Sequence, residues 1–173
     1  DNQMTVDFGN NIKQTITFST TTSADVSVAK KKISSVPDHT NNGVIFYYEV
    51  EISSEKGTVD GINILDSLLW QGLSGSYNTD ISVKKIGTDG NIDDSYSYNN
   101  ELTITPASKD AWGNVTDATI TGTLPKLEAG EKYIITYSTL KIVDETEAIA
   151  KVHNKATVSN EHVYGYSQPY SEG

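Results

Sequence analysis

Val44-Ile-Phe-Tyr-Tyr-Glu-Val-Glu-Ile52 is the strongest strand signal in the chain and indicates its fold class. Successive side chains of a β-strand point to opposite faces of the sheet, so every second residue shares a face. One face of this stretch is apolar or aromatic throughout, because it carries Val44, Phe46, Tyr48, Val50 and Ile52. We therefore expect this strand to run through the centre of the hydrophobic core.

The rest of the chain consists of short runs rich in β-branched residues, separated by polar turns and poor in helix formers. This pattern is typical of an all-β, Greek-key β-sandwich with about 9–10 strands. A polar loop is expected at 34–43 and one helical turn at 144–150. Further strands are predicted at 4–8, 13–19, 25–33, 62–68, 81–86, 102–104, 116–124, 132–143 and 151–159.

The chain has 173 residues, which is enough for one well-buried domain. We expect residues 23–163 to form this sandwich domain. Residues 1–22 are interpreted as N-terminal strands or a linker from a preceding domain. Residues 164–173 are interpreted as an exit segment.

Composition and charge exclude several functions. The chain has 13 basic and 23 acidic residues, and its net charge of −10 argues against nucleic acid or an anionic membrane as a partner. No apolar run approaches the roughly 20 residues that a membrane-spanning helix needs, so no membrane insertion is expected. The absence of cysteine excludes disulfides and thiolate metal sites.

Three polar residues fall on strand faces that are otherwise apolar, namely Lys30, Asp66 and Asn154. A buried polar group costs free energy unless it is hydrogen-bonded, so each of them needs a partner or a function. Lys32 shares the phase of Lys30, whereas Lys31 points to the opposite face. The first and last strands of a Greek-key sandwich can lie side by side, which would allow the lysine and the asparagine to touch.

Each of the three residues also has an ordinary structural explanation. A lysine near a strand end commonly extends its ammonium group to solvent. Asp66 can cap a turn after its strand, and Asn154 can hydrogen-bond to the backbone.

The order of the segments resembles that of a known family. A lysine-rich first strand is followed by 43–52 (GVIFYYEVEI), 62–68 (INILDSL), 132–137 (KYIITY) and 152–158 (VHNKATV). Over residues 24–160 this order is similar to that of the isopeptide-forming, immunoglobulin-like domains of Gram-positive surface proteins, of the collagen-adhesin A-region type. The resemblance implies an immunoglobulin-like form of the expected sandwich.

The resemblance also implies a spontaneous amide bond between a first-strand lysine and a last-strand asparagine, promoted by an inward aspartate. Asn154 matches the last-strand asparagine and Asp66 matches the inward aspartate. Lys30, Lys31 and Lys32 all remain candidates for the first-strand lysine, and the strand phase favours Lys30.

The chemistry suits these residue types. Burial favours the neutral amine of the lysine, which is the nucleophile, and the neutral acid of Asp66. Asp66 is expected to donate a hydrogen bond to the carbonyl oxygen of Asn154 and polarise it, after which ammonia leaves.

These features predict a structural stalk or scaffold module of a bacterial cell-surface adhesin or pilus-like protein. The expected location is extracellular, at the cell surface, with attachment to the cell wall through the full-length protein. The expected partners are neighbouring domains of the same surface protein. The cross-link is a single-turnover autocatalytic event, so neither an enzyme nor a cofactor is predicted.

An alternative of a different class is a ligand-binding adhesin domain. Trp70, Trp112, Tyr96 and Tyr98 lie in or beside predicted loops, as does Tyr77, where aromatic side chains can contact a host protein or a glycan. A hydrolase is a third interpretation, but the chain lacks the Gly-x-Ser-x-Gly motif of a nucleophile elbow.

No metal site is predicted. The segment 89–94 places oxygen ligands at alternate positions, as calcium loops do, but it lacks the distal glutamate, so a solvated turn is expected. His39, His153 and His162 are not spaced as metal ligands.

Overall fold

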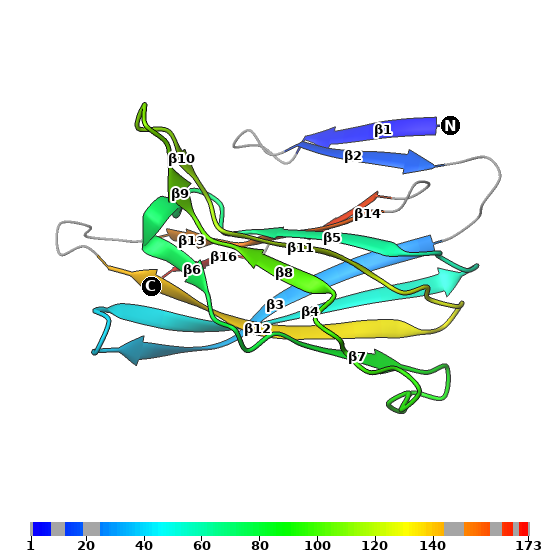
Figure 1. Ribbon diagram of the computed structural model, residues 1–173. Helices are drawn as coiled ribbons and strands as arrows, with labels where there is room; N and C mark the ends of the chain where they lie inside the picture. Colours follow the sequence, from blue (N-terminus) through cyan, green and yellow to red (C-terminus); the bar gives the residue numbers. More distant parts are fainter. Residues whose placement is uncertain are drawn as a thin grey trace.

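Strand β4 (Gly43–Lys56) contains the alternating segment 44–52, and the computed structural model places it inside a sandwich of two antiparallel sheets (Figure 1). The structure describes residues 2–7, 13–18, 25–143, 151–159, 164–167 and 170–172. Phe46, Tyr48, Val50 and Ile52 are all buried, as the alternation predicts. The predicted all-β sandwich is confirmed.

The first sheet, called here the β4 sheet, has the order β3-β4-β12-β6, and β7 also pairs with β12. Strands β4 and β12 are paired from Lys132 opposite Ser53 to Ile142 opposite Gly43, which makes them the long centre of this sheet. Its members are β3 (Asp25–Asp38), β4, β6 (Gly75–Tyr77), β7 (Ser82–Ile86) and β12 (Lys132–Ile142).

The second sheet, called here the β5 sheet, has the order β15-β14-β5-β11-β8. Its strands are β5 (Ile62–Ser67), β8 (Leu102–Thr105), β11 (Thr119–Leu124), β14 (Lys155–Ser159) and β15 (Tyr164–Ser167). Residues 164–167, which the sequence pattern assigns to an exit segment, pair with β14 as its edge strand.

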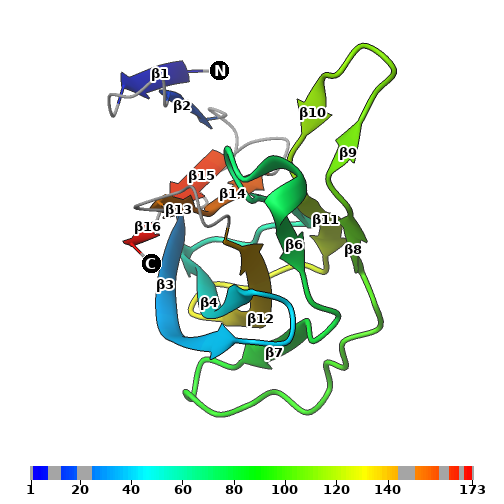
Figure 2. The same cartoon turned by 90° about the vertical axis from the view of Figure 1, so that its left-hand side faces the viewer.

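The remaining elements are small. A short 3₁₀ helix, η1 (Gly72–Ser74), lies between β5 and β6. The two-stranded sheets are β1 (Asn2–Asp7) with β2 (Lys13–Phe18), β9 (Ser108–Lys109) with β10 (Val115–Thr116), and β13 (Lys151–His153) with β16 (Tyr170–Glu172). Strands β9 and β10 form a hairpin that projects from the body of the sandwich (Figure 2).

The core fills the space between the two sheets. The largest fully buried side chains come from both layers and include Tyr48, Tyr133, Ile62, Ile120 and Leu124. Interdigitation of such side chains from two sheets about 10 Å apart is the usual packing of a β-sandwich. The described part of the chain contains no helix long and apolar enough to span a bilayer.

The predicted polar loop at 34–43 is wrong. Strand β3 continues through this segment to Asp38, with a register shift between Lys32 and Ser34, and the turn to β4 takes only residues 39–42. Strand β3 lies at the end of the sheet order, and an edge strand accepts both polar residues and Pro37, whose missing N–H is not needed there. The polar composition therefore reflects an exposed edge rather than a loop.

A single strand at 151–159 is also wrong, because the segment is divided at Asn154. Strand β13 pairs with β16, whereas β14 pairs with β5 and β15. The predicted helical turn at 144–150 lies outside the described residues.

Candidate functional site

The candidate site lies between the two sheets, and both sheets contribute to it. Lys30 comes from β3 in the β4 sheet, whereas Asp66 comes from β5 in the β5 sheet. Asn154 directly precedes β14, the neighbour of β5, and Ala156 is the register partner of Asp66. The lysine and the asparagine therefore meet across the interior of the sandwich and not as neighbours within one sheet.

Lys30 touches both other members of the predicted set. Its Nζ lies 2.6 Å from Oδ2 of Asp66 and also donates a hydrogen bond to Oδ1 of Asn154. The side chains of Lys30 and Asp66 are 0% and 3% exposed, and Asn154 is fully buried. An amine, a carboxyl group and a carboxamide are thus in contact in a site closed to bulk water.

Two tyrosines complete the polar network. The hydroxyl of Tyr77 donates to Oδ1 of Asp66 at 2.5 Å, and that of Tyr137 donates to Oδ2 at 2.7 Å. Nδ2 of Asn154 in turn donates to the Tyr137 hydroxyl at 3.0 Å. Asp66 therefore accepts three hydrogen bonds, which offsets the cost of burying its carboxylate.

The sequence pattern missed both tyrosines. Tyr77 was expected in a loop, but it is a buried residue of the short strand β6, paired with β12 through Thr139. Tyr137 falls on the inward phase of β12 with Tyr133 and Ile135. A tyrosine on a core face needs a partner for its hydroxyl, and this is the signal that identifies Tyr137.

Aromatic rings surround the amine. Nζ of Lys30 lies 4.9 Å from the ring centroid of Tyr48 and 5.1 Å from that of Tyr137. The rings of Tyr48 and Tyr137 are stacked at 5.7 Å, and the rings of Tyr77 and Tyr137 are tilted to each other at the same centroid distance. These rings exclude water from the amine while their faces still interact favourably with its charge.

Burial lowers the pKa of Lys30 from 10.5 to about 8, although the neighbouring Asp66 opposes the shift. With that value, about a tenth of the molecules carry a neutral amine at pH 7. The pKa values of Tyr77 and Tyr137 are raised well above 10, first by burial and then by the charge of Asp66. Both tyrosines therefore remain protonated at neutral pH.

The other two lysines lie elsewhere. The side chain of Lys31 is 68% exposed and lies 3.3 Å from Glu49 in an ion pair on the outer face of the sheet. Lys32 is half-buried, and its Nζ lies 5.6 Å from the ring centroid of Phe46. Of the three candidate lysines, Lys30 is the one in contact with Asp66 and Asn154.

Asp66 reaches Asn154 differently from the expected direct hydrogen bond. Its Oδ2 contacts Lys30 on one side and Tyr137 on the other, and each of these groups contacts a different end of the Asn154 carboxamide. Asp66 is thus placed to accept a proton from the amine. The carboxamide is placed as the electrophile.

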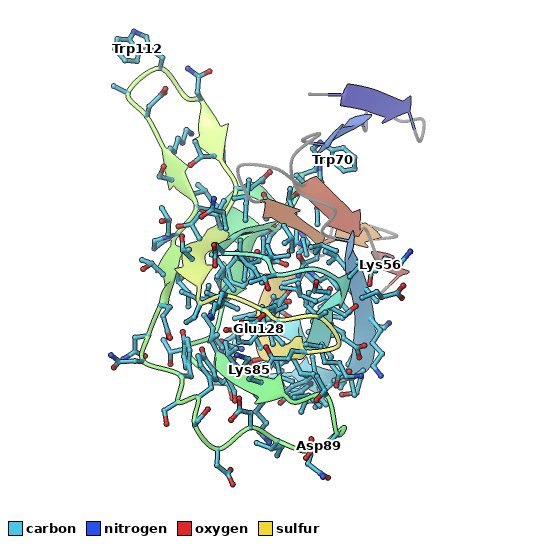
Figure 3. The ribbon with its side chains drawn as sticks, turned by 90° about the vertical axis from the view of Figure 1, so that its right-hand side faces the viewer. Lys56, Trp70, Lys85, Asp89, Trp112 and Glu128 are labelled. Atoms are coloured by element: carbon cyan, nitrogen blue, oxygen red, sulfur yellow. The ribbon has the colours of Figure 1, made fainter. Side chains whose placement is uncertain are left out.

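The two tryptophans predicted as ligand contacts are exposed. Trp112 is 88% exposed at the tip of the β9–β10 hairpin (Figure 3), and Trp70 is 60% exposed. The carboxylate of Asp110 accepts from the backbone N–H of Trp112 at 2.9 Å. Asp117 does the same for Trp70 at 3.0 Å and so supports its left-handed backbone, with φ at 62°.

Tyr96 and Tyr98 lie in a different environment. Both pack against the core, and the ring of Tyr96 meets that of Tyr133 edge-on at 5.3 Å. The Tyr98 hydroxyl donates to the carbonyl of Leu102 at 3.4 Å. They cover one end of the core, which is the ordinary role of loop aromatics.

Among the described residues, no group of three His, Asp or Glu side chains is arranged to hold a metal ion. Asp89 caps its own turn by accepting from the backbone N–H of Asn91 at 2.9 Å. His39 is exposed, and the side chains of His153 and His162 lie outside the described residues.

Comparison with known proteins finds no matching family model and no matching curated protein. Solved structures do match. The collagen-binding domain of a Staphylococcus aureus adhesin is 19% identical, with a TM-score of 0.44 over 83% of this chain and 97% of that chain. The collagen-binding subdomain of the Enterococcus faecalis surface protein ACE is 12% identical, with a TM-score of 0.43 over 84% and 94%. The major pilin SpaD of Corynebacterium diphtheriae is 12% identical, with a TM-score of 0.48 over 85% of this chain and 34% of that chain. In fold, the chain is similar to these adhesin and pilin structures.

Proposed function

We propose that this chain is a structural module of a bacterial cell-surface adhesin or pilus-like protein, held together by a spontaneous isopeptide bond between Lys30 and Asn154. The observation that carries the proposal is the buried contact of the Lys30 amine with both Asp66 and the Asn154 carboxamide. A buried ion pair with no further use is a poor source of stability, because desolvation offsets most of the attraction between its charges. A reaction explains why these three groups are brought together.

The proposed reaction begins with transfer of a proton from the Lys30 ammonium to Asp66, over the 2.6 Å that separates the two groups. The neutral Nζ then attacks Cγ of Asn154. A new C–N bond forms, the bond from Cγ to Nδ2 breaks, and ammonia leaves. The fold supplies much of the acceleration, because it holds the two reactants together before they react. The reaction occurs once per molecule, so the chain is not a turnover enzyme.

The bond has a mechanical consequence. Lys30 belongs to the β4 sheet and Asn154 adjoins a strand of the β5 sheet, so the amide would connect the two layers covalently. It would also close a loop of 124 residues. Force applied to the ends of the chain would pass through this bond and bypass the core, which suits a stalk unit between neighbouring domains of an extracellular, wall-attached protein.

Intact mass spectrometry under denaturing conditions tests the proposal. The folded protein is expected to be lighter than its calculated mass by one ammonia, and proteolysis should yield a branched peptide that joins Lys30 to Asn154. Asp66→Asn and Lys30→Arg should each restore the full mass. Lys32→Arg is the matched control, because Lys32 lies on the same strand and face, and it should keep the deficit. A full calculated mass for the mature wild-type protein would refute the proposal.

A second candidate function is binding of a host protein or glycan through the exposed tryptophans. Asp117 and Asp110 organise the turns that hold Trp70 and Trp112 in solvent. Trp70 also has a positive φ, and such backbone conformations outside glycine cluster at functional sites. Trp112→Ala should abolish adhesion to host extracellular matrix while leaving the thermal unfolding midpoint unchanged. Unchanged adhesion of this variant and of Trp70→Ala would exclude the candidate.

A further inference from the structure

The hydroxyl of Tyr137 lies between the carboxyl group of Asp66 and the nitrogen that must leave from Asn154. It is 2.7 Å from Oδ2 of Asp66 and 3.0 Å from Nδ2 of Asn154. The same Oδ2 contacts Nζ of Lys30. Nucleophile, carboxyl group, phenol and leaving nitrogen therefore form one continuous chain of hydrogen bonds.

The chemistry of the leaving group requires a proton donor at this point. Nδ2 cannot depart as an amide anion, so it must gain a proton as its bond to Cγ breaks. In the ground state its lone pair is delocalised into the carbonyl, and Nδ2 acts as a donor. When Cγ becomes tetrahedral the lone pair localises, and Nδ2 becomes a base. In the part of the chain that the structure describes, the Tyr137 hydroxyl is the group hydrogen-bonded to Nδ2.

We propose that Tyr137 is the general acid of the cross-linking reaction and passes a proton from Asp66 to the leaving nitrogen. This inference rests on the proposed isopeptide function. Nζ of Lys30 gives one proton to Oδ2 of Asp66 before its attack. It gives a second to the same oxygen as the tetrahedral centre collapses, after Asp66 has passed the first one on. Tyr137 donates its own proton to Nδ2 and recovers one from Asp66. One amide forms and one ammonia departs. Tyr137 ends as it began, and Asp66 holds the second proton of Lys30 until it passes that proton to the departing ammonia, which leaves as ammonium.

The environment of Tyr137 agrees with this role. The ring is buried, and burial together with the charge of Asp66 raises the pKa of Tyr137 well above 10, so a free phenolate is disfavoured. Tyr137 can therefore donate its proton only if another reaches it at the same time. The contact with Oδ2 of Asp66 provides that replacement, and no water molecule is needed to complete the transfer.

Tyr77 provides a matched control. It also donates a short hydrogen bond to Asp66, but to the other oxygen, Oδ1. It is buried like Tyr137 and lies in the same sheet. Replacing either tyrosine with phenylalanine removes one hydroxyl from Asp66, but only Tyr137→Phe removes the contact with the leaving nitrogen.

The test follows bond formation in newly made chains. Cell-free synthesis is stopped, samples are quenched in denaturant at timed intervals, and the fraction that has lost ammonia is read by intact mass spectrometry. A general acid typically contributes about 10²–10⁴-fold, so Tyr137→Phe should slow the reaction by that factor. Tyr77→Phe should slow it by less than about tenfold, since it alters only the hydrogen bonding of Asp66.

A second variant covers the case in which Tyr137→Phe does not fold. Replacing Tyr137 with 3-fluorotyrosine keeps the hydroxyl and the shape but makes the phenol more acidic. The rate should change several-fold at this position and clearly less when the same substitution is made at Tyr77, which touches Asp66 but is not the group hydrogen-bonded to the leaving nitrogen.

The outcomes separate the two proposals. If the wild-type chain never loses ammonia, the isopeptide function itself fails. If the wild-type chain loses ammonia while the two phenylalanine variants react at equal rates, only the role of Tyr137 is overturned. Equal rates for the two fluorotyrosine variants would overturn it as well.

Discussion

Replacing Asn154 with alanine should remove the cross-link and most of the stability that it provides. The bond closes a loop of 124 residues, which restricts the unfolded chain but leaves the folded chain almost unaffected. The loop-entropy relation used for disulfides gives about 16 cal/mol/K for this length, or about 5 kcal/mol at 25 °C. Loss of the buried carboxamide contacts adds about 1 kcal/mol. Since whole domains are stable by only about 5–15 kcal/mol, this is a large fraction of the total.

Urea unfolding measures the change. With an m-value of about 2–3 kcal/mol/M, the midpoint should fall by about 2 M or more. Near-ultraviolet circular dichroism is the suitable signal, because Tyr48, Tyr133 and Tyr137 are buried, whereas Trp70 and Trp112 are already exposed in the folded protein.

Tyr77→Phe is the control for polar contacts, because it removes a buried hydrogen bond to Asp66 and retains the isopeptide cross-link. It should cost about 1–2 kcal/mol. The reasoning is refuted if wild-type protein carries the cross-link by mass and yet Asn154→Ala is no less stable than Tyr77→Phe. Chain entropy would then contribute nothing measurable.

Three further predictions concern the reaction, the response to force and the packing. The reactive state holds one proton shared between Lys30 and Asp66, and the pKa of Lys30 is about 8. The rate of ammonia loss should therefore fall by up to about tenfold per pH unit above pH 8. A rate that keeps rising to pH 10 would contradict this prediction. In single-molecule stretching, the cross-link should hide the chain between Lys30 and Asn154, which lie 124 positions apart. Lys30→Arg should therefore lengthen the unfolding extension by about 420 Å at 3.4 Å per residue. Equal extensions would exclude the bond. Gly122→Ala should lower the free energy of unfolding by about 1–3 kcal/mol, measured by heat or urea. The Cβ of the new alanine would lie 2.1 Å from the backbone oxygen of Glu101 and would force β8 to move. Unchanged stability would show that this edge strand shifts freely.

Much of the fold follows from the period of two in the sequence. Alternation predicted β4 and β12 and the inward faces of Lys30 and Asp66, because side-chain direction in a strand depends only on the local backbone. The same reasoning failed for β3, since an exposed edge strand and a loop have similar polar compositions. Strand phase favoured Lys30 over Lys31, but it could not separate Lys30 from Lys32, because these two lysines share a face.

The amino-acid sequence is therefore sufficient to predict the sandwich class and the polar side chains on core faces, since both depend on neighbours along the chain. The contact of Lys30 with Asn154 across the two sheets, and the enclosure of Asp66 by Tyr77 and Tyr137, arise only in the folded chain. These contacts join residues between 11 and 124 positions apart. Contacts over such long separations in sequence depend on the path of the whole chain and on the packing of the core. No local sequence pattern encodes which strands face each other.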